Sequence, residues 1–158
     1  MTVNEILILV RQRLNDMEKT TFSDEELIHV LNDAMDSICV DMSESYDPDL
    51  LKTIELNTTG VKLPDDFIAW QGQFALTYLP NSDGDTVITP MDGEWDGENA
   101  TLKYFAFKNH VSSLTDKIPF RTSVHLKKLM NQCITEIKGG NTNNSKGTSD
   151  TDSDSGAS

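Results

Sequence analysis

Residues 22–34 read Phe-Ser-Asp-Glu-Glu-Leu-Ile-His-Val-Leu-Asn-Asp-Ala, and this stretch decides much of the fold. Ser23 is a good N-cap and Glu26 stands three residues later, which is the spacing of a capping box. Phe22 before the cap and Leu27 after it have the spacing of a hydrophobic staple. Apolar residues then recur at helical spacing, at Leu27, Val30, Leu31, Ala34, Ile38 and Met42. The stretch therefore predicts an amphipathic helix over about residues 23–43.

Two further helices are predicted, one on each side of this element in the chain. Thr2 and Glu5 repeat the capping-box spacing before a helix expected over about residues 3–18. Its apolar positions are Val3, Ile6, Leu7, Val10, Leu14 and Met17. The short connection at 18–22 favours an antiparallel hairpin of the first two helices. A third helix is expected over about 123–138, capped by Thr122 or Ser123, with one face made of Leu126, Leu129, Met130, Cys133 and Ile137.

Between the second and third helices the apolar period changes from helical to alternating. Short strand candidates, each bounded by Gly, Pro, Asn or Asp, are residues 53–56, 61–63, 74–79, 87–89 and 101–107. They predict a small antiparallel β-sheet inserted over about residues 52–107, with loops at 81–85 and 92–99. The fold class is therefore α+β: an antiparallel helix hairpin plus a C-terminal helix form a small bundle, and the small sheet is inserted in it.

The last twenty residues differ in composition from the rest of the chain. Residues 139–158 are polar and of low complexity, with Ala157 as the single apolar residue. Such a segment buries too little apolar surface to offset its ordering entropy, so we expect it to be disordered on its own. The chain is then one domain over residues 1–138 followed by a polar tail.

The formal net charge of −13 bears on the class of partner. Binding to a phosphate backbone depends on clustered Lys and Arg, so the chain is a poor candidate for wrapping nucleic acid. An acidic surface either lets DNA pass without adhesion or imitates DNA for a basic partner. The N-terminal sequence has no signal-peptide pattern and no apolar run has the length of a membrane span, so we expect a cytoplasmic origin and no membrane partner.

No pattern of catalytic or metal-ligating residues predicts an enzyme, a cofactor or a metal site. Cys39 and Cys133 fall at apolar helix positions, which favours free buried thiols over a disulfide. The pair at 65–66 follows a strand and a proline, which favours a turn or a helix start over an acid–base dyad. Seven aromatic residues cluster around the expected sheet, and core packing accounts for them better than base stacking does: Phe67, Trp70, Phe74, Tyr78, Tyr104, Phe105 and Phe107.

The order of the motifs resembles that of the head-to-tail adaptor (connector, head-completion) proteins of tailed bacteriophages. Residues 21–34 are similar to that family's capped helix, residues 61–67 (Val-Lys-Leu-Pro-Asp-Asp-Phe) to its Pro-Asp turn, and residues 104–107 (Tyr-Phe-Ala-Phe) to its Tyr-Phe strand. Residues 112–120 and a closing helix follow, so that the resemblance covers about residues 2–138.

This resemblance implies a structural virion protein at the head–tail interface, assembled in the host bacterial cytoplasm. Identical copies, a dodecamer by this likeness, form a ring under the portal protein, extend the DNA channel without binding DNA specifically, and carry the next tail component. Candidate partner contacts are three lysines and five acids: Lys127, Lys128, Lys138, Asp83, Asp85, Asp92, Glu94 and Asp96.

Two other interpretations stay open at this point. The first is an acidic DNA-mimic inhibitor of a nucleic-acid-binding protein, which is suggested by the charge alone. The second is a small enzyme or calcium-dependent module that uses Asp92, Glu94 and Asp96, spaced loosely like a calcium loop. The twelfth position of such a loop is Lys103, which has the wrong charge for a calcium ligand.

Overall fold

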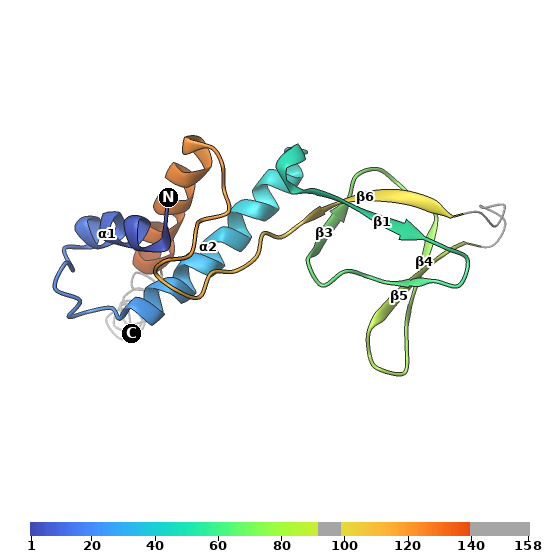
Figure 1. The fold of residues 1–158 in the computed structure, drawn as a ribbon, viewed down its shortest axis with the longest axis horizontal. Coiled ribbons are helices and arrows are strands. Elements are labelled where there is room, and N and C mark those ends of the chain that lie inside the picture. The colour runs from blue at the N-terminus through green and yellow to red at the C-terminus, as the bar shows by residue number, and fades with distance from the viewer. Residues whose placement is uncertain (92–98, 140–158) are drawn as a thin grey trace, which may run out of the picture. The chain divides into compact units, whose positions relative to one another are not determined.

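The structure is a computed structural model that describes residues 1–91 and 99–139. The chain divides into two compact units. The helical unit comprises Met1–Ile38 and the described part of Asn109–Ser158, and the β unit comprises Cys39–Lys108. The predicted α+β class is confirmed, because helices and small antiparallel sheets are both present (Figure 1). The expected loop at 92–99, except residue 99, and the tail from residue 140 lie outside the described residues.

Helix α1 (Val3–Leu14) begins with the predicted capping box. The Glu5 backbone N–H donates to Thr2 Oγ1 at 3.2 Å, and the Thr2 N–H donates to Glu5 Oε2 at 2.6 Å. The helix ends at Leu14, not near residue 18 as predicted, because Asn15 takes a left-handed conformation with φ of 55° and its N–H returns to the last turn. Met17, assigned to the buried stripe from its spacing, is therefore outside the helix and 51% exposed.

Helix α2 (Asp24–Glu44) has the boundaries expected of residues 23–43 to within one residue. The Glu26 N–H donates to Ser23 Oγ at 3.1 Å, and the Ser23 N–H donates to Glu26 Oε2 at 3.4 Å, so this capping box is also confirmed. Its apolar face buries Leu27, Leu31, Ala34, Met35 and Ile38. Residues up to Ile38 belong to the helical unit and residues 39–44 to the β unit.

The helix over 123–139 completes the helical unit and matches the prediction for 123–138. The His125 N–H donates to Thr122 Oγ1 at 3.2 Å, which makes Thr122 the cap. Leu129, Cys133 and Ile137 are buried, whereas Leu126 and Met130 are half-buried. The core of the unit also contains Val3, Ile6, Leu7 and Val10 of α1. In the described ranges, no helix combines the length and apolarity that crossing a membrane requires.

The β unit contains two three-stranded antiparallel sheets, where the sequence predicted one sheet. In the first, β1 (Leu51–Leu56), β6 (Ala100–Ala106) and β3 (Phe67–Trp70) lie in the order β1-β6-β3. In the second, β2 (Val61–Lys62), β5 (Thr86–Pro90) and β4 (Leu76–Pro80) lie in the order β2-β5-β4. A short 3₁₀ helix (Pro48–Leu50) precedes β1. Four residues from both sheets form one buried cluster: Leu56, Leu76, Ile88 and Leu102.

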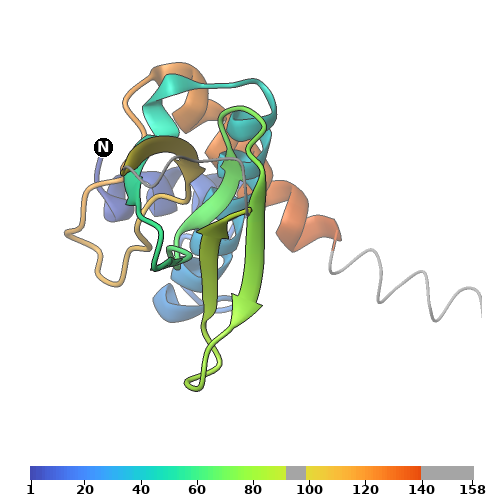
Figure 2. The same cartoon turned by 90° about the vertical axis from the view of Figure 1, so that its right-hand side faces the viewer.

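Strand β3 is the element that the sequence analysis missed. Its residues are apolar throughout, so they show no alternation of apolar and polar side chains. The preceding Asp65 and Asp66 form the predicted turn, and the chain then enters the sheet directly. Figures 1 and 2 show a second feature of the unit, the β4–β5 hairpin (yellow-green), which projects beyond the other strands of the β unit.

Candidate interaction surfaces

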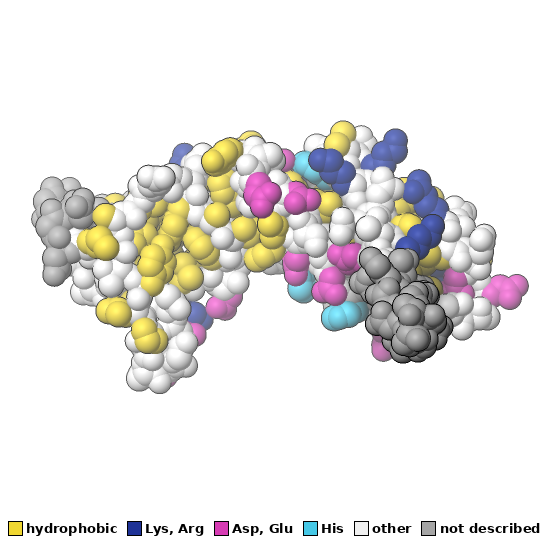
Figure 3. Space-filling model, turned by 180° about the vertical axis from the view of Figure 1, so that it is seen from behind, with side chains coloured by type: hydrophobic (Ala, Val, Ile, Leu, Met, Phe, Trp, Pro, Cys, Tyr) yellow, Lys and Arg dark blue, Asp and Glu magenta, His cyan; other side chains and the backbone are white. Residues whose placement is uncertain are grey.

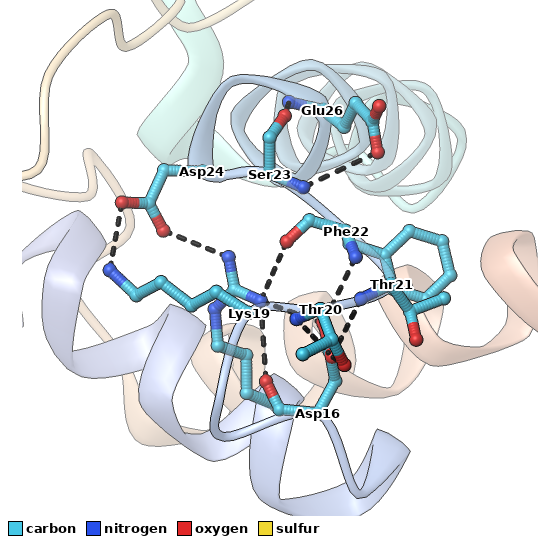
Figure 4. Close-up of polar contacts among 9 residues, drawn as sticks. Asp16, Lys19, Thr20, Thr21, Phe22, Ser23, Asp24 and Glu26 are labelled. Atoms are coloured by element: carbon cyan, nitrogen blue, oxygen red, sulfur yellow. Dashed lines mark hydrogen bonds and ion pairs between the residues drawn. The ribbon is translucent and has the colours of Figure 1, made fainter.

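A buried polar network closes the connection between α1 and α2 (Figure 4). The Arg11 guanidinium, 2% exposed, donates to Asp16 Oδ2 at 2.8 Å, to the Phe22 carbonyl at 2.9 Å and to Asp24 Oδ1 at 2.9 Å. Asp16, 3% exposed, also accepts from three backbone N–H groups, those of Thr20, Thr21 and Phe22, at 2.9–3.0 Å. The hydrogen bonds of this network join α1, the connecting loop and the start of α2. The network therefore fixes the position of the two helices and does not form a reactive site at the surface.

The carboxylates of this network are stabilised in their ionised form. The Thr21 N–H is the main cause that holds the pKa of Asp16 below its ordinary value, and burial opposes it. Hydrogen bonds from Lys19 and then from Arg11 lower the pKa of Asp24 in the same way. Both shifts arise from satisfied hydrogen bonds within this structural network and not from a proton-transfer site.

The helical unit carries an apolar groove between α1 and the start of helix 123–139. Its volume is about 320 Å³, and its lining consists of Met1, Ile6, Leu9, Ser123, Val124, Leu126, Lys127 and Met130. Ile6 is fully buried and Leu126 and Met130 are half-buried, whereas Met1, Leu9 and Val124 are exposed. Val124 is 60% exposed although it lines the same groove as the buried Ile6. The groove is thus an apolar recess that reaches the surface.

The three candidate lysines lie on the same helix but in different settings. Lys127 lines the groove, Lys128 follows it on the exposed surface, and Lys138 is exposed at the other end of the helix. Residues 121–130 contain no Asp or Glu. Figure 3 shows Lys and Arg side chains gathered over the helical unit on the face in view. Of the three candidate lysines, the structure therefore places only Lys127 in the lining of the recess.

The candidate acids Asp83 and Asp85 lie in the turn between β4 and β5. Asn81 Oδ1 accepts from the N–H groups of Asp83 and Asp85, both at 2.9 Å, and Gly84 supplies the positive φ of 86° that closes the turn. The Asp83 side chain is exposed, and Asp85 lies 3.6 Å from Lys62 Nζ. The other three candidate acids, Asp92, Glu94 and Asp96, lie outside the described residues, and so does the calcium-loop interpretation that uses them.

Five aromatic residues of the β unit form one connected cluster: Phe67, Trp70, Phe74, Tyr78 and Tyr104. The rings of Phe67 and Trp70 lie 4.9 Å apart, Phe67 and Tyr104 5.9 Å, and Trp70 and Phe74 5.8 Å. Trp70 Nε1 donates to Tyr78 Oη at 2.6 Å. The cluster therefore extends from the interior of the sheets to their surface, and Figure 3 shows apolar side chains over the β unit.

Core packing, predicted for seven aromatic residues around the sheet, holds for only some of them. Tyr104 and Phe105 are buried, but Phe74 and Tyr78 are exposed, so for these two the prediction is wrong. Two sheets of three strands have too little volume to enclose this many rings. Leu79 follows Tyr78 on β4, points to the opposite face of the strand and is 59% exposed.

The pair Asp65 and Asp66 has structural roles. Asp66 accepts from the Tyr104 hydroxyl at 3.0 Å and pairs with Lys52, while Asp65 pairs with Lys62 at 3.3 Å. Burial first, and the Asp66 carboxylate second, raise the pKa of Tyr104 to about 12. The predicted turn is confirmed, and Asp66 connects it to β1 and β6.

Both cysteines are buried thiols, as predicted, and they form no disulfide, so the disulfide alternative is wrong. Burial, with a smaller effect of Glu136, raises the pKa of Cys133 to about 12. This thiol is therefore held in its protonated, unreactive form. In residues 1–91 and 99–139, no three His, Cys, Asp or Glu side chains are arranged to hold a metal ion.

Sequence reasoning missed the apolar groove and the buried arginine. Ile8 and Leu9 are apolar residues of α1 that lie off its predicted stripe, and both are exposed. They were the available signal that α1 has a second apolar face. Arg11 stands four residues after Leu7, on the buried side of the helix, where a charged residue needs a buried partner.

No protein-family model matches this chain, and no curated protein matches it.

Proposed function

We propose that this protein is a non-enzymatic structural component of a tailed-phage virion, located between the portal and the tail. In this role, identical copies form a ring that extends the DNA channel and gives the next tail component a surface to attach to. Its partners are the portal protein, a tail or tail-tube component and further copies of itself. The ring is a dodecamer by the family resemblance, assembled in the cytoplasm of the host bacterium.

The observation that carries the proposal is the position of the resembling motifs in the fold. The motif at 21–34 forms the cap and first part of α2, and the motif at 61–67 leads through β2 and a turn into β3. The motif at 104–107 begins within β6, which pairs with both β1 and β3. Residues 112–120 return to the helical unit, where the Val3 N–H donates to the Asp116 carbonyl at 2.9 Å. Each motif thus has an architectural role, as in an assembly subunit.

Charge and exposed apolar surface add support of a different kind. A net charge of −13 repels the DNA backbone, which suits the wall of a channel through which DNA moves. Both units also expose apolar side chains, among them Val124 on the helical unit and Leu79 on the β unit. Exposed apolar patches mark surfaces that bind other proteins, and a ring subunit needs several such surfaces.

The test is binding of the purified protein to rings of the portal protein encoded by the same phage genome. We expect co-sedimentation with the portal and, by electron microscopy, an extra ring of density at the tail-facing end of the portal. Absence of binding would overturn the proposal. Displacement of DNA from a basic nucleic-acid-binding protein, without portal binding, would instead support the DNA-mimic interpretation.

A further inference from the structure

The apolar groove of the helical unit has the properties of one half of a protein–protein contact. Three apolar residues at its rim, Met1, Leu9 and Val124, are exposed although they lie beside the buried Ile6. Covering such a surface is favourable by roughly 25 cal/mol for each Å² removed from water. Lys127 lies in the lining, and the segment 121–130 carries positive charges without any acid. The groove therefore suits an apolar partner segment that is also negatively charged.

The β4–β5 hairpin has the complementary properties. Leu79 exposes an apolar side chain on the face of β4 opposite to Tyr78, and the turn that follows carries Asp83 and Asp85. Residues 78–85 contain no Lys or Arg. The Asn81 side chain and Gly84 hold the turn in one conformation, so that little entropy is lost when it binds. The hairpin projects beyond the other strands of the unit, which lets it enter a recess on another molecule (Figures 1 and 2).

We propose that the β4–β5 hairpin of one copy docks in the groove of the helical unit of a second copy. Leu79 covers the apolar rim, and Asp83 faces Lys127. The occupant is a second copy because the two surfaces are complementary in charge and in apolar character. Copies with a net charge of −13 repel one another over most of their surface. The basic segment beside the groove therefore determines the orientation in which a second copy binds.

A contact of this kind joins two different surfaces of the same chain. Repeated from copy to copy it is heterologous, and it closes into a ring when the rotation per copy divides a full turn. The inference rests on the proposed function, because it names the surfaces through which neighbouring subunits of that ring would meet. It predicts that Lys127 and Asp83 act as a pair, whereas Lys138 on the same helix takes no part.

Photo-cross-linking between isotopically distinct copies tests the contact. We would place benzoylphenylalanine at residue 124 and mix light- and heavy-isotope copies, both at high concentration in low salt and bound to portal rings. The expected product joins residue 124 of one copy to the peptide containing Leu79 of the other, with mixed isotopes. Cross-links within a single chain, cross-links to other peptides or no cross-links in either condition overturn the proposal.

Charge variants sharpen the result. Lys127→Glu should lower the yield of this cross-link at least about tenfold, because a repulsive pair replaces an attractive one. Mixing the Lys127→Glu chain, carrying the photo-reactive residue, with Asp83→Lys chains should restore the yield. The matched controls are Lys138→Glu and Asp41→Lys, which make the same charge changes on exposed sites outside the contact and should leave it unchanged. A loss of yield in these controls equal to that of Lys127→Glu overturns the pairing.

The two proposals fail in different ways. Portal binding with cross-links away from the hairpin contradicts the docking inference and leaves the proposed function standing. Hairpin-to-groove cross-links without portal binding contradict the head–tail function and leave the contact between copies. Circular dichroism of each variant, compared with the unsubstituted protein, shows whether a lost cross-link reflects loss of folding.

Discussion

Replacement of Arg11 by Met is the most direct test of how the helical unit is held together. Met keeps much of the length and apolar volume of the side chain but removes the guanidinium that contacts Asp16, Phe22 and Asp24. Removal of one partner of a buried ion pair typically costs about 3–5 kcal/mol, because the other charge is left buried without compensation.

The structure places the expected cost at the lower end of that range. After the substitution Asp16 still accepts three backbone N–H groups at 2.9–3.0 Å, so its charge is only partly uncompensated. Asp24 is at the margin of the network, with its side chain 31% exposed, and water can replace the lost donor. We therefore expect Arg11→Met to lower the free energy of unfolding by about 3 kcal/mol.

Urea unfolding followed by far-ultraviolet circular dichroism at neutral pH measures this loss. Arg13→Met is the matched control, because Arg13 lies on the same helix with an exposed contact to Asn131 at 2.9 Å and should cost no more than about 0.5 kcal/mol. Addition of Asp16→Asn to the Arg11→Met chain should recover part of the stability by removing the orphaned charge. A cost for Arg11→Met below about 1 kcal/mol, or equal to that of Arg13→Met, would refute the reasoning.

Three further predictions concern pH, thiol chemistry and the turn after β1. The pKa values of Asp16, Asp24 and Asp116 are lowered in the folded protein, so the unfolded chain binds more protons in acid. The urea midpoint should therefore stay constant near neutral pH and fall as pH drops through and below the ordinary carboxyl value of 3.8. A midpoint that rises on acidification contradicts this assignment. Cys133, with its pKa raised to about 12, should not react with a disulfide reagent at mildly alkaline pH until denaturant is added, and rapid reaction of the native protein would show that the thiol is accessible. Gly60→Ala should cost roughly 1–3 kcal/mol in urea unfolding, because φ is +96° there and the new Cβ would lie 2.7 Å from the Thr89 methyl group; a neutral result would mean that the turn rearranges freely.

The elements that could be predicted are those whose signal lies within a few residues. The Ser23 and Glu26 capping box forms as expected because both partners and the helix start are adjacent in the chain. The end of α1 was misplaced because it depends on Asn15 adopting a left-handed conformation, which apolar spacing does not report. Strand β3 was missed because it forms by pairing with β6, which is far away in sequence. The residues of β3 alone do not show an alternating strand pattern.

The same distinction applies to the candidate surfaces. Lys127 and Lys128 were identified as exposed cations, yet only the fold places Lys127 in the lining of an apolar recess. Tyr78 was expected in the core because it belongs to an aromatic cluster, and its exposure depends on how small the two sheets are. The ion pair between Arg11 and Asp16 depends on the conformation of the loop after α1, which cannot be predicted from composition or from residue spacing.

The insertion of the β unit into the helical unit also has a consequence for folding. Helix 123–139 packs in the same unit as α1, but about 70 residues, Cys39–Lys108, separate the two segments of that unit in the chain. Closing a flexible loop of that length costs about 4 kcal/mol in chain entropy. If the β unit folds first, it joins its own two ends and removes most of that cost before the last helix arrives. During synthesis, the apolar faces of α1 and of the first part of α2 therefore remain exposed until helix 123–139 has been made. Destabilisation of the β unit should then slow formation of the helical unit, although its own contacts are unchanged.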